Sequence, residues 1–211
     1  MNDEFKAIER RTVRSFYDDG LFEIALGAIF LLLGVYFFGE IALPETSSLP
    51  MFLSSAFFFV IVFAGLLINK ILRFLKQRIT YPRAGYVSFR KERSPKRRLT
   101  AGVIGAVTGA SIPVLMQFIP SFRDMLPAFN GFLLGIVFLL LASKSGVARY
   151  FVLACISAFA GIALAAAGIG DIRGVSLHCA LLGAAMVLSG LAALIVFLRR
   201  NKRAAEVPDE P

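Results

Sequence analysis

The chain has 211 residues, of which 57% are hydrophobic and only 18% are charged, and its mean hydropathy is +0.74. Soluble domains carry about 25% charged residues, so this composition excludes a soluble enzyme fold and an intrinsically disordered chain. Two cysteines are too few for a disulfide scaffold. The composition therefore predicts a membrane protein.

The charges fall in a few short stretches, and the apolar stretches between them are long enough to cross a bilayer. A helix needs about 20 apolar residues to cross a hydrocarbon core of about 30 Å. The sequence therefore predicts an all-α fold, a polytopic membrane bundle of six transmembrane helices that occupies residues 20–198. The six predicted spans are 20–38, 50–68, 99–119, 126–142, 150–169 and 175–198.

The residues before the first span predict a separate helix on the membrane surface. Within residues 1–19, charged residues alternate with Phe5, Ile8 and Phe16 at helical spacing. This pattern is typical of an amphipathic helix that lies in the membrane interface. The first span is longer than the apolar region of a signal peptide, so we expect it to remain in the mature protein. Residues 199–211 form a polar tail.

Residues 69–98 form a basic loop between the second and third predicted spans. The second helix is expected to run past the bilayer and to end before Pro82, because the residue ahead of a proline is disfavoured in helical geometry. From Ile79 to Phe89, β-branched and aromatic residues flank a Pro-Arg-Ala-Gly turn. This pattern predicts a short β-hairpin.

The basic residues predict the orientation of the chain. All 23 Lys and Arg residues except Arg123 and Arg173 fall in 1–19, 69–98, the turn between the fourth and fifth spans, or the tail. These segments share one side of a six-pass chain, and basic loops stay in the cytoplasm. We therefore expect a multi-pass protein of the plasma (bacterial inner) membrane, with the N-terminus and the C-terminus in the cytoplasm.

The net charge of +9 would favour nucleic-acid binding in a soluble chain. Here the bias of Lys and Arg toward one membrane face accounts for nearly all of that charge. We therefore expect no nucleic-acid partner.

Polar side chains inside the predicted spans are few, and such residues are costly in lipid and often functional. Glu23 and His178 are the ionisable ones, at opposite ends of the bundle and too far apart for direct proton transfer. Asp18, Asp19 and Glu23 are expected to stabilise the N-terminal end of the first helix. Gln117, Asn130 and His178 are expected to gather near the outer face as an interhelical hydrogen-bond group, with a solute site as the alternative.

The sequence carries no motif of a known catalytic site. It has no glycine-rich phosphate loop after a strand, no G-x-S-x-G elbow and no H-E-x-x-H zinc motif. Converging metal ligands are also missing from the pattern around His178. We therefore expect a non-enzymatic protein with no cofactor and no metal.

The basic loop is the most distinctive part of the sequence, and juxtamembrane cations attract anionic phospholipid headgroups. We expect the protein to bind anionic lipid or a protein partner through this loop. The residues proposed to make those contacts are Tyr81, Arg83, Tyr86, Arg90, Lys91 and Arg93. The alternative function is a small transporter or channel for an ion or small solute, in which Glu23, Asn130 and His178 would be the intramembrane functional residues.

Small residues recur along several spans at intervals that suit helix packing. They predict contacts between helices, either within the bundle or with a second copy of the chain or another membrane protein. Gly27 and Gly34 lie seven residues apart, as do Gly183 and Gly190. Three-span units related by inversion would produce such an echo, but apolar sequence produces such matches easily, so chance similarity is the preferred explanation.

Overall fold

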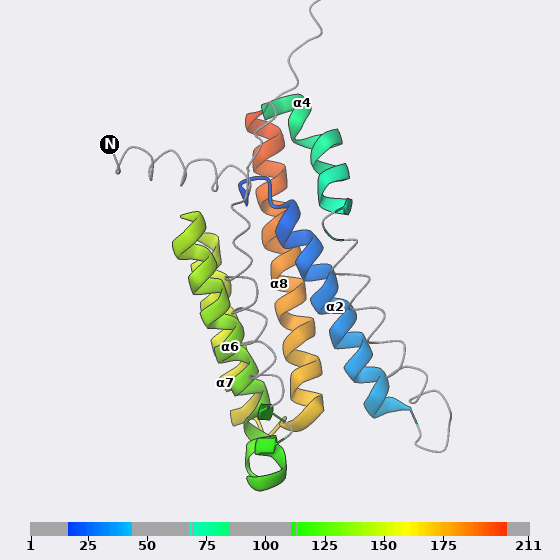
Figure 1. Ribbon diagram of the computed structural model, residues 1–211, viewed down its shortest axis with the longest axis vertical. Helices are drawn as coiled ribbons and strands as arrows, with labels where there is room; N and C mark the ends of the chain where they lie inside the picture. Colours follow the sequence, from blue (N-terminus) through cyan, green and yellow to red (C-terminus); the bar gives the residue numbers. More distant parts are fainter. Residues whose placement is uncertain (1–16, 44–67, 69, 85–110, 113, 202–211) are drawn as a thin grey trace, which may run out of the picture.

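The structure is a computed structural model that describes residues 17–43, 68, 70–84, 111–112 and 114–201 of the chain. The described part is all-helical and contains no strand. Its helices are α2 (Leu21–Ala42), α4 (Tyr81–Ala84), α6 (Phe122–Ser145), α7 (Arg149–Ala166) and α8 (Asp171–Arg200), shown in Figure 1. Residues 70–79 form a further helix, which we call the arm helix.

Four of the described helices, α2, α6, α7 and α8, are long and apolar enough to cross a membrane. Each overlaps most of one predicted span, although its first and last residues differ from the predicted ones. Their outward faces carry large apolar side chains such as Val35, Phe159 and Leu188, which are 70%, 75% and 67% exposed. Such surfaces are unfavourable in water and favourable in lipid, so the protein is a membrane protein.

The observed helix boundaries differ from the predicted ones. The fourth predicted span began at residue 126, but α6 begins at Phe122 and holds Pro127 inside its second turn. The last predicted span covered 175–198, but α8 runs from Asp171 to Arg200. The hydropathy pattern marks only the apolar part of a helix, whereas these helices continue into the charged residues on either side. Most of the second predicted span, 50–68, and of the third, 99–119, lies outside the described residues, as does the amphipathic segment 1–16. The described part of the third span, residues 111–112 and 114–118, is helical.

The predicted β-hairpin is wrong in its first strand. The arm helix ends at Ile79, Thr80 lies in a turn, and Tyr81–Ala84 form the short helix α4. Pro82 lies in the first turn of α4, where a helix does not require the backbone N–H that proline lacks. The expected end of the preceding helix before Pro82 is confirmed. Residues 85–89, the second predicted strand, lie outside the described residues.

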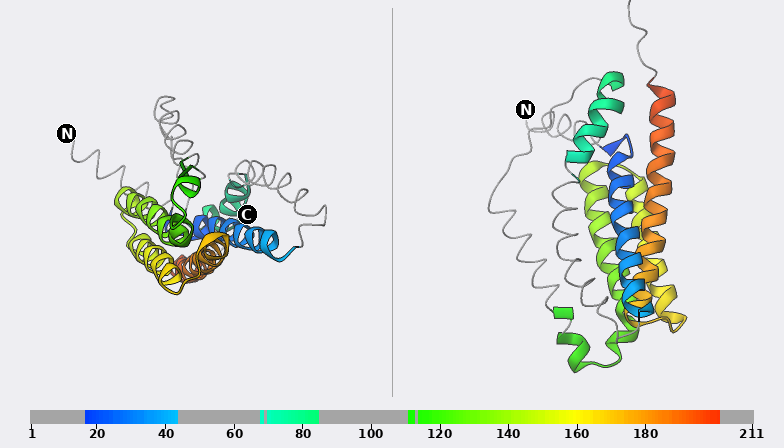
Figure 2. Two further views of the ribbon diagram at one scale, coloured as in Figure 1. Left: turned by 90° about the horizontal axis from the view of Figure 1, so that it is seen from below. Right: turned by 90° about the vertical axis from the view of Figure 1, so that its right-hand side faces the viewer.

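The four long helices form two antiparallel pairs, α2 with α8 and α6 with α7. Seen end-on, α6, α7, α8 and α2 follow one another along an arc (Figure 2). The buried core joins the two pairs through side chains of α6, α7 and α8. It comprises Phe138, Ala142, Val147, Tyr150, Leu153, Ala154, Leu182 and Met186.

Glycines allow α2 and α8 to approach each other closely. Gly20, Gly27 and Gly34 of the α2 region face Gly190, Gly183 and Ser176 of α8. A Cβ atom on Gly27 would lie 2.8 Å from the Gly183 carbonyl oxygen, and a Cβ atom on Gly183 would lie 2.8 Å from the Gly27 carbonyl oxygen. Ser176 adds a hydrogen bond from its hydroxyl to the Gly34 carbonyl oxygen, at 2.8 Å. The predicted packing role of the small residues is therefore confirmed for this interface.

Replacing Gly183 with alanine should force α2 and α8 apart, because the added Cβ would meet backbone atoms of Gly27 and Leu31. We expect a loss of about 1–3 kcal/mol in the free energy of unfolding in detergent, the usual cost of overpacking. Gly135→Ala is the matched control on α6, since its nearest neighbour would be 3.3 Å away. Equal stability of the two variants would contradict the close α2–α8 contact.

Candidate functional site

Two carboxylates lie one helical turn apart where α2 begins, and both are fully buried. Gly20 separates them, with a φ of 71° that favours glycine and with its backbone against Gly190 of α8. This conformation starts the helix at Leu21 and leaves Asp19 just outside it, while Glu23 lies in the first turn. Both acids stand at the N-terminal end of the helix, as the sequence predicts, and the structure gives them longer-range partners as well.

Asp19 connects the start of α2 to the arm helix. Its Oδ2 atom lies 2.9 Å from the Lys76 ammonium and accepts a hydrogen bond from the Thr80 hydroxyl at 2.9 Å. Its Oδ1 atom accepts a hydrogen bond from the Leu21 backbone N–H at 3.2 Å. One carboxylate therefore binds both its own helix and a segment about sixty residues further along the chain.

Glu23 connects α2 to α7 and α8. Its Oε1 atom accepts a hydrogen bond from Arg149 Nε, and its Oε2 atom accepts one from the Ser189 hydroxyl at 3.0 Å. The Arg149 side chain is 23% exposed and also donates to the Tyr17 carbonyl oxygen. Glu23 is therefore ionically paired, and the pair joins the α2–α8 and α6–α7 pairs at one end of the bundle.

Two tyrosines pack around this ion pair. The rings of Tyr17 and Tyr150 meet edge to face, with centroids 5.8 Å apart. The buried Tyr150 hydroxyl lies beside Glu23, and the described part of the chain gives it no hydrogen-bond partner of good geometry. These rings help to bury the Glu23 carboxylate, which is fully shielded from water, and so strengthen its electrostatic attraction for Arg149.

Burial shifts the pKa values of two groups outside the membrane-spanning helices, Lys76 and Tyr17. Burial lowers the pKa of the Lys76 ammonium, while the adjacent Asp19 carboxylate acts in the opposite direction. Burial also raises the pKa of the Tyr17 phenol. Removing the Lys76 ammonium from water therefore carries a cost that its pairing with Asp19 offsets only in part.

A second polar group lies further along the bundle, around His178. The Asn130 amide nitrogen lies 3.1 Å from His178 Nδ1, and His178 Nε2 lies 3.0 Å from the Ser157 carbonyl oxygen. A carbonyl oxygen can only accept, so Nε2 carries the proton and Nδ1 accepts from Asn130. The predicted interhelical hydrogen-bond group is confirmed for Asn130 and His178. The third expected member, Gln117, is exposed, and Ser157 takes part instead.

The predicted loop contacts are only partly described. Tyr81 is half-buried at the start of α4, and Arg83 lies in the same helix. Tyr86, Arg90, Lys91 and Arg93 lie outside the described residues. Within the described ranges, no three His, Cys, Asp or Glu side chains gather closely enough to hold a metal ion.

Several residues of the site were not singled out from the sequence. From the sequence, Lys76 and Arg149 indicate only the orientation of the chain, and nothing in the pattern distinguishes Thr80 or Ser189. The spacing of Asp19 and Glu23 was the available signal, because residues four apart project from the same side of a helix.

No known protein family, curated protein or solved structure matches the chain.

Replacing Glu23 with glutamine should leave the Arg149 guanidinium without a counter-ion. We expect a loss of about 3 kcal/mol in the free energy of unfolding, the lower end for breaking a buried ion pair, since Arg149 is partly accessible to water. Thermal unfolding in detergent measures this loss. Glu40→Gln is the control, because Glu40 bonds only within its own helix, to Tyr36 at 2.6 Å, in the bonds described for it. A comparable effect of both substitutions would count against the pair.

Replacing Asn130 with alanine should remove the donor to the buried His178 Nδ1 atom. An unsatisfied buried polar atom costs about 1–3 kcal/mol, and unfolding in detergent should show a loss of that size. Gln117→Ala removes an exposed amide and should change stability little. If both variants unfold alike, the hydrogen bond between Asn130 and His178 is not formed in the membrane protein.

Proposed function

We propose that this protein is a non-enzymatic membrane protein that binds anionic phospholipid headgroups through the loop 69–98. In this proposal the chain crosses the plasma (bacterial inner) membrane six times, and both termini lie in the cytoplasm. The observation that supports this proposal is that the arm helix, at the start of that loop, has two different sides. One side is fixed to the bundle, and the other is exposed and both apolar and cationic.

The exposed side of the arm helix has the composition of a surface that lies in a membrane interface. Ile71 and Phe74 are 45% and 53% exposed, and Lys70, Arg73 and Arg78 are exposed beside them. The Arg78 guanidinium lies 4.8 Å from the centre of the Phe74 ring. Apolar side chains can enter the boundary between headgroups and acyl chains while the cations pair with phosphates.

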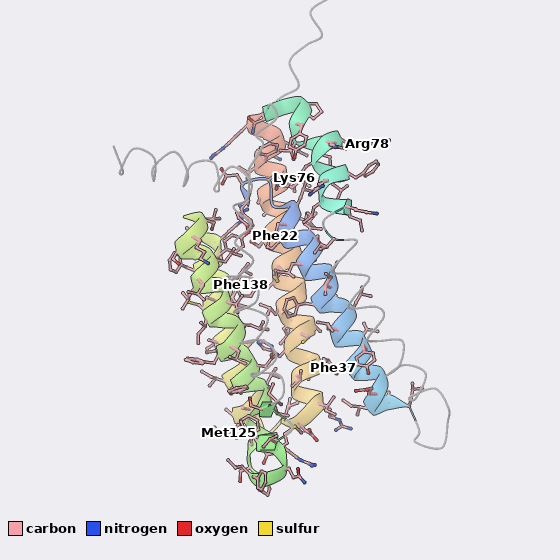
Figure 3. All side chains as sticks on the ribbon, in the orientation of Figure 1. Phe22, Phe37, Lys76, Arg78, Met125 and Phe138 are labelled. Atoms are coloured by element: carbon pink, nitrogen blue, oxygen red, sulfur yellow. The ribbon has the colours of Figure 1, made fainter. Side chains whose placement is uncertain are left out.

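The opposite side of the arm helix keeps that surface in place. Leu72, Lys76 and Thr80 are buried and follow one another at intervals of four, so they lie on one side of the helix. Figure 3 shows Lys76 on the side toward α2 and Arg78 on the outer side. These buried residues orient the helix so that Lys70, Arg73 and Arg78 face outward.

Other described cations support the proposed location of this surface. Lys144 at the end of α6, and Arg199 and Arg200 at the end of α8, are exposed at the same end of the bundle as the arm helix. Arg123 and Arg173 are at the other end. A cluster of cations at one membrane face attracts anionic lipid by about 1 kcal/mol per charge at low salt. In the proposal, Arg83, Arg90, Lys91 and Arg93 extend this surface, together with Tyr81 and Tyr86.

Replacing both Arg73 and Arg78 with glutamine should weaken retention of phosphatidylglycerol. Two charges at about 1 kcal/mol each correspond to a loss of up to roughly thirtyfold, reduced by salt. Native mass spectrometry of protein released from mixed-lipid nanodiscs measures the retained lipid. The control is the double variant Arg123→Gln and Arg173→Gln, which removes two exposed cations at the other end.

Unchanged retention in the arm variant would contradict lipid binding by the arm helix. If the arm variant instead loses a co-purifying protein and keeps its lipid, a protein partner occupies the surface. Equal losses in the arm variant and the control would show that charge anywhere on the molecule suffices.

The alternative function, a small transporter or channel, is favoured by one observation, the fully buried Glu23 inside the bundle. Its bonds to Arg149 and Ser189 also account for Glu23 as part of the fold. A transporter should lose solute or proton flux in liposomes on Glu23→Gln while the folded fraction persists. A lipid-binding protein should show no flux before or after the substitution.

A further inference from the structure

The arm helix is attached to the bundle through very few buried side chains. Leu72, Lys76 and Thr80 are the buried residues of the segment 70–80, and two of these three bind the same acceptor, Asp19. Leu75 and Ile79 are only half-buried. Among the bonds described for the arm helix, those to the Asp19 carboxylate are the ones that connect it to the start of α2.

The ion pair between Lys76 and Asp19 can be replaced at little cost in free energy by an ion pair between Lys76 and another anion. Removing an ammonium and a carboxylate from water costs nearly as much as their attraction returns, so a buried ion pair contributes little net stability. Losing only one partner is unfavourable, because the other charge stays buried and unpaired. Lys76 can therefore leave Asp19 at low cost only where another anion is available to it.

The position of Lys76 on the arm helix places it close to other anions, the headgroup phosphates of the proposed lipid-binding surface. Lys76 follows Arg73 by three residues, so the two side chains are neighbours along the helix surface. Arg73 and Lys70 are exposed on the side that we assign to phospholipid headgroups. If the helix moved away from the bundle and turned about its axis, Lys76 would reach the same phosphates.

We propose that the Asp19 carboxylate is an internal competitor of anionic phospholipid headgroups for Lys76, and that it holds the arm helix against the bundle until such lipids release it. This inference rests on the proposed function, which it deepens by adding a docked and a released state. In the docked state Lys76 and Thr80 bind Asp19. In the released state Lys76 joins Lys70 and Arg73 on the lipid headgroups, and Asp19 is open to water and to the cations around it.

The position of the arm helix can be measured by electron-spin distance measurements on the full-length protein. Spin labels on Gln77→Cys and Ser143→Cys, both exposed positions, report the distance between the arm helix and the end of α6. Cys155→Ser and Cys179→Ala remove the native thiols. The protein is placed in nanodiscs of phosphatidylcholine alone, or of phosphatidylcholine mixed with phosphatidylglycerol.

The wild-type arm should give one population in phosphatidylcholine, and phosphatidylglycerol should add a second population displaced by about 10 Å, the diameter of one helix. Asp19→Asn should show the displaced population in both lipids. Asp124→Asn, which neutralises an exposed acid at the other end of the bundle, should behave like the wild type. Identical wild-type distances in the two lipids would overturn the proposal.

Two milder variants keep the proposal testable if Asp19→Asn fails to fold. Thr80→Val removes one donor to Asp19 and should shift the wild-type balance partway toward the displaced population. Lys76→Met keeps the apolar stem without the charge, and its distance should not respond to phosphatidylglycerol. A full response of Lys76→Met would contradict the role of Lys76.

Lipid retention separates failure of this proposal from failure of the proposed function. If the wild type retains phosphatidylglycerol but its arm does not move, the competition is wrong and lipid binding stands. If the wild type retains no phosphatidylglycerol while Asp19→Asn still displaces the arm, lipid binding is wrong, and Asp19 anchors the helix without a lipid competitor.

Discussion

A carboxylate inside a helical membrane bundle must be paired, because neither lipid nor packed side chains can solvate its charge. The fold satisfies this requirement at the start of α2 with two such groups. Asp19 binds Lys76 and Thr80, and Glu23 binds Arg149 and Ser189. The same short segment therefore joins the arm helix, α7 and α8 at one end of the bundle. The position of the proposed lipid-binding surface depends on these bonds.

The α2–α8 interface brings this polar segment into place. Gly27 and Gly34 are seven residues apart, and so are Gly183 and Gly190, which is the spacing of residues that return to the same side of two packed helices. An internal repeat would also produce this spacing. The interface alone requires the spacing, so the glycines do not need a duplication to explain them. Gly20 continues the series and fixes where Asp19 and Glu23 stand relative to α8.

The sequence predicted the membrane-spanning helices because each depends on a local property, a run of apolar residues of sufficient length. It also predicted the pairing of Asn130 with His178, since both are isolated polar residues at similar depth. The sequence could not identify the partners of Asp19 and Glu23, because they are distant along the chain. Thr80 lies 61 positions from Asp19, and Arg149 and Ser189 lie 126 and 166 positions from Glu23. Many cations at this end of the bundle could pair with Glu23, and only the three-dimensional arrangement of α7 selects Arg149. The hairpin prediction failed because alternation over so few residues cannot distinguish a strand from a short helix that begins at a proline.

A double-mutant cycle between Glu23 and Arg149 most directly tests whether this ion pair joins α2 to α7. Glu23→Gln, Arg149→Met and the combined variant are compared with the wild type by their free energies of unfolding in detergent. The account predicts a coupling energy of about 2 kcal/mol, because the second substitution should cost little once the first has broken the pair. Additive losses, with a coupling energy below about 0.5 kcal/mol, would contradict a bond between α2 and α7 at this end of the bundle.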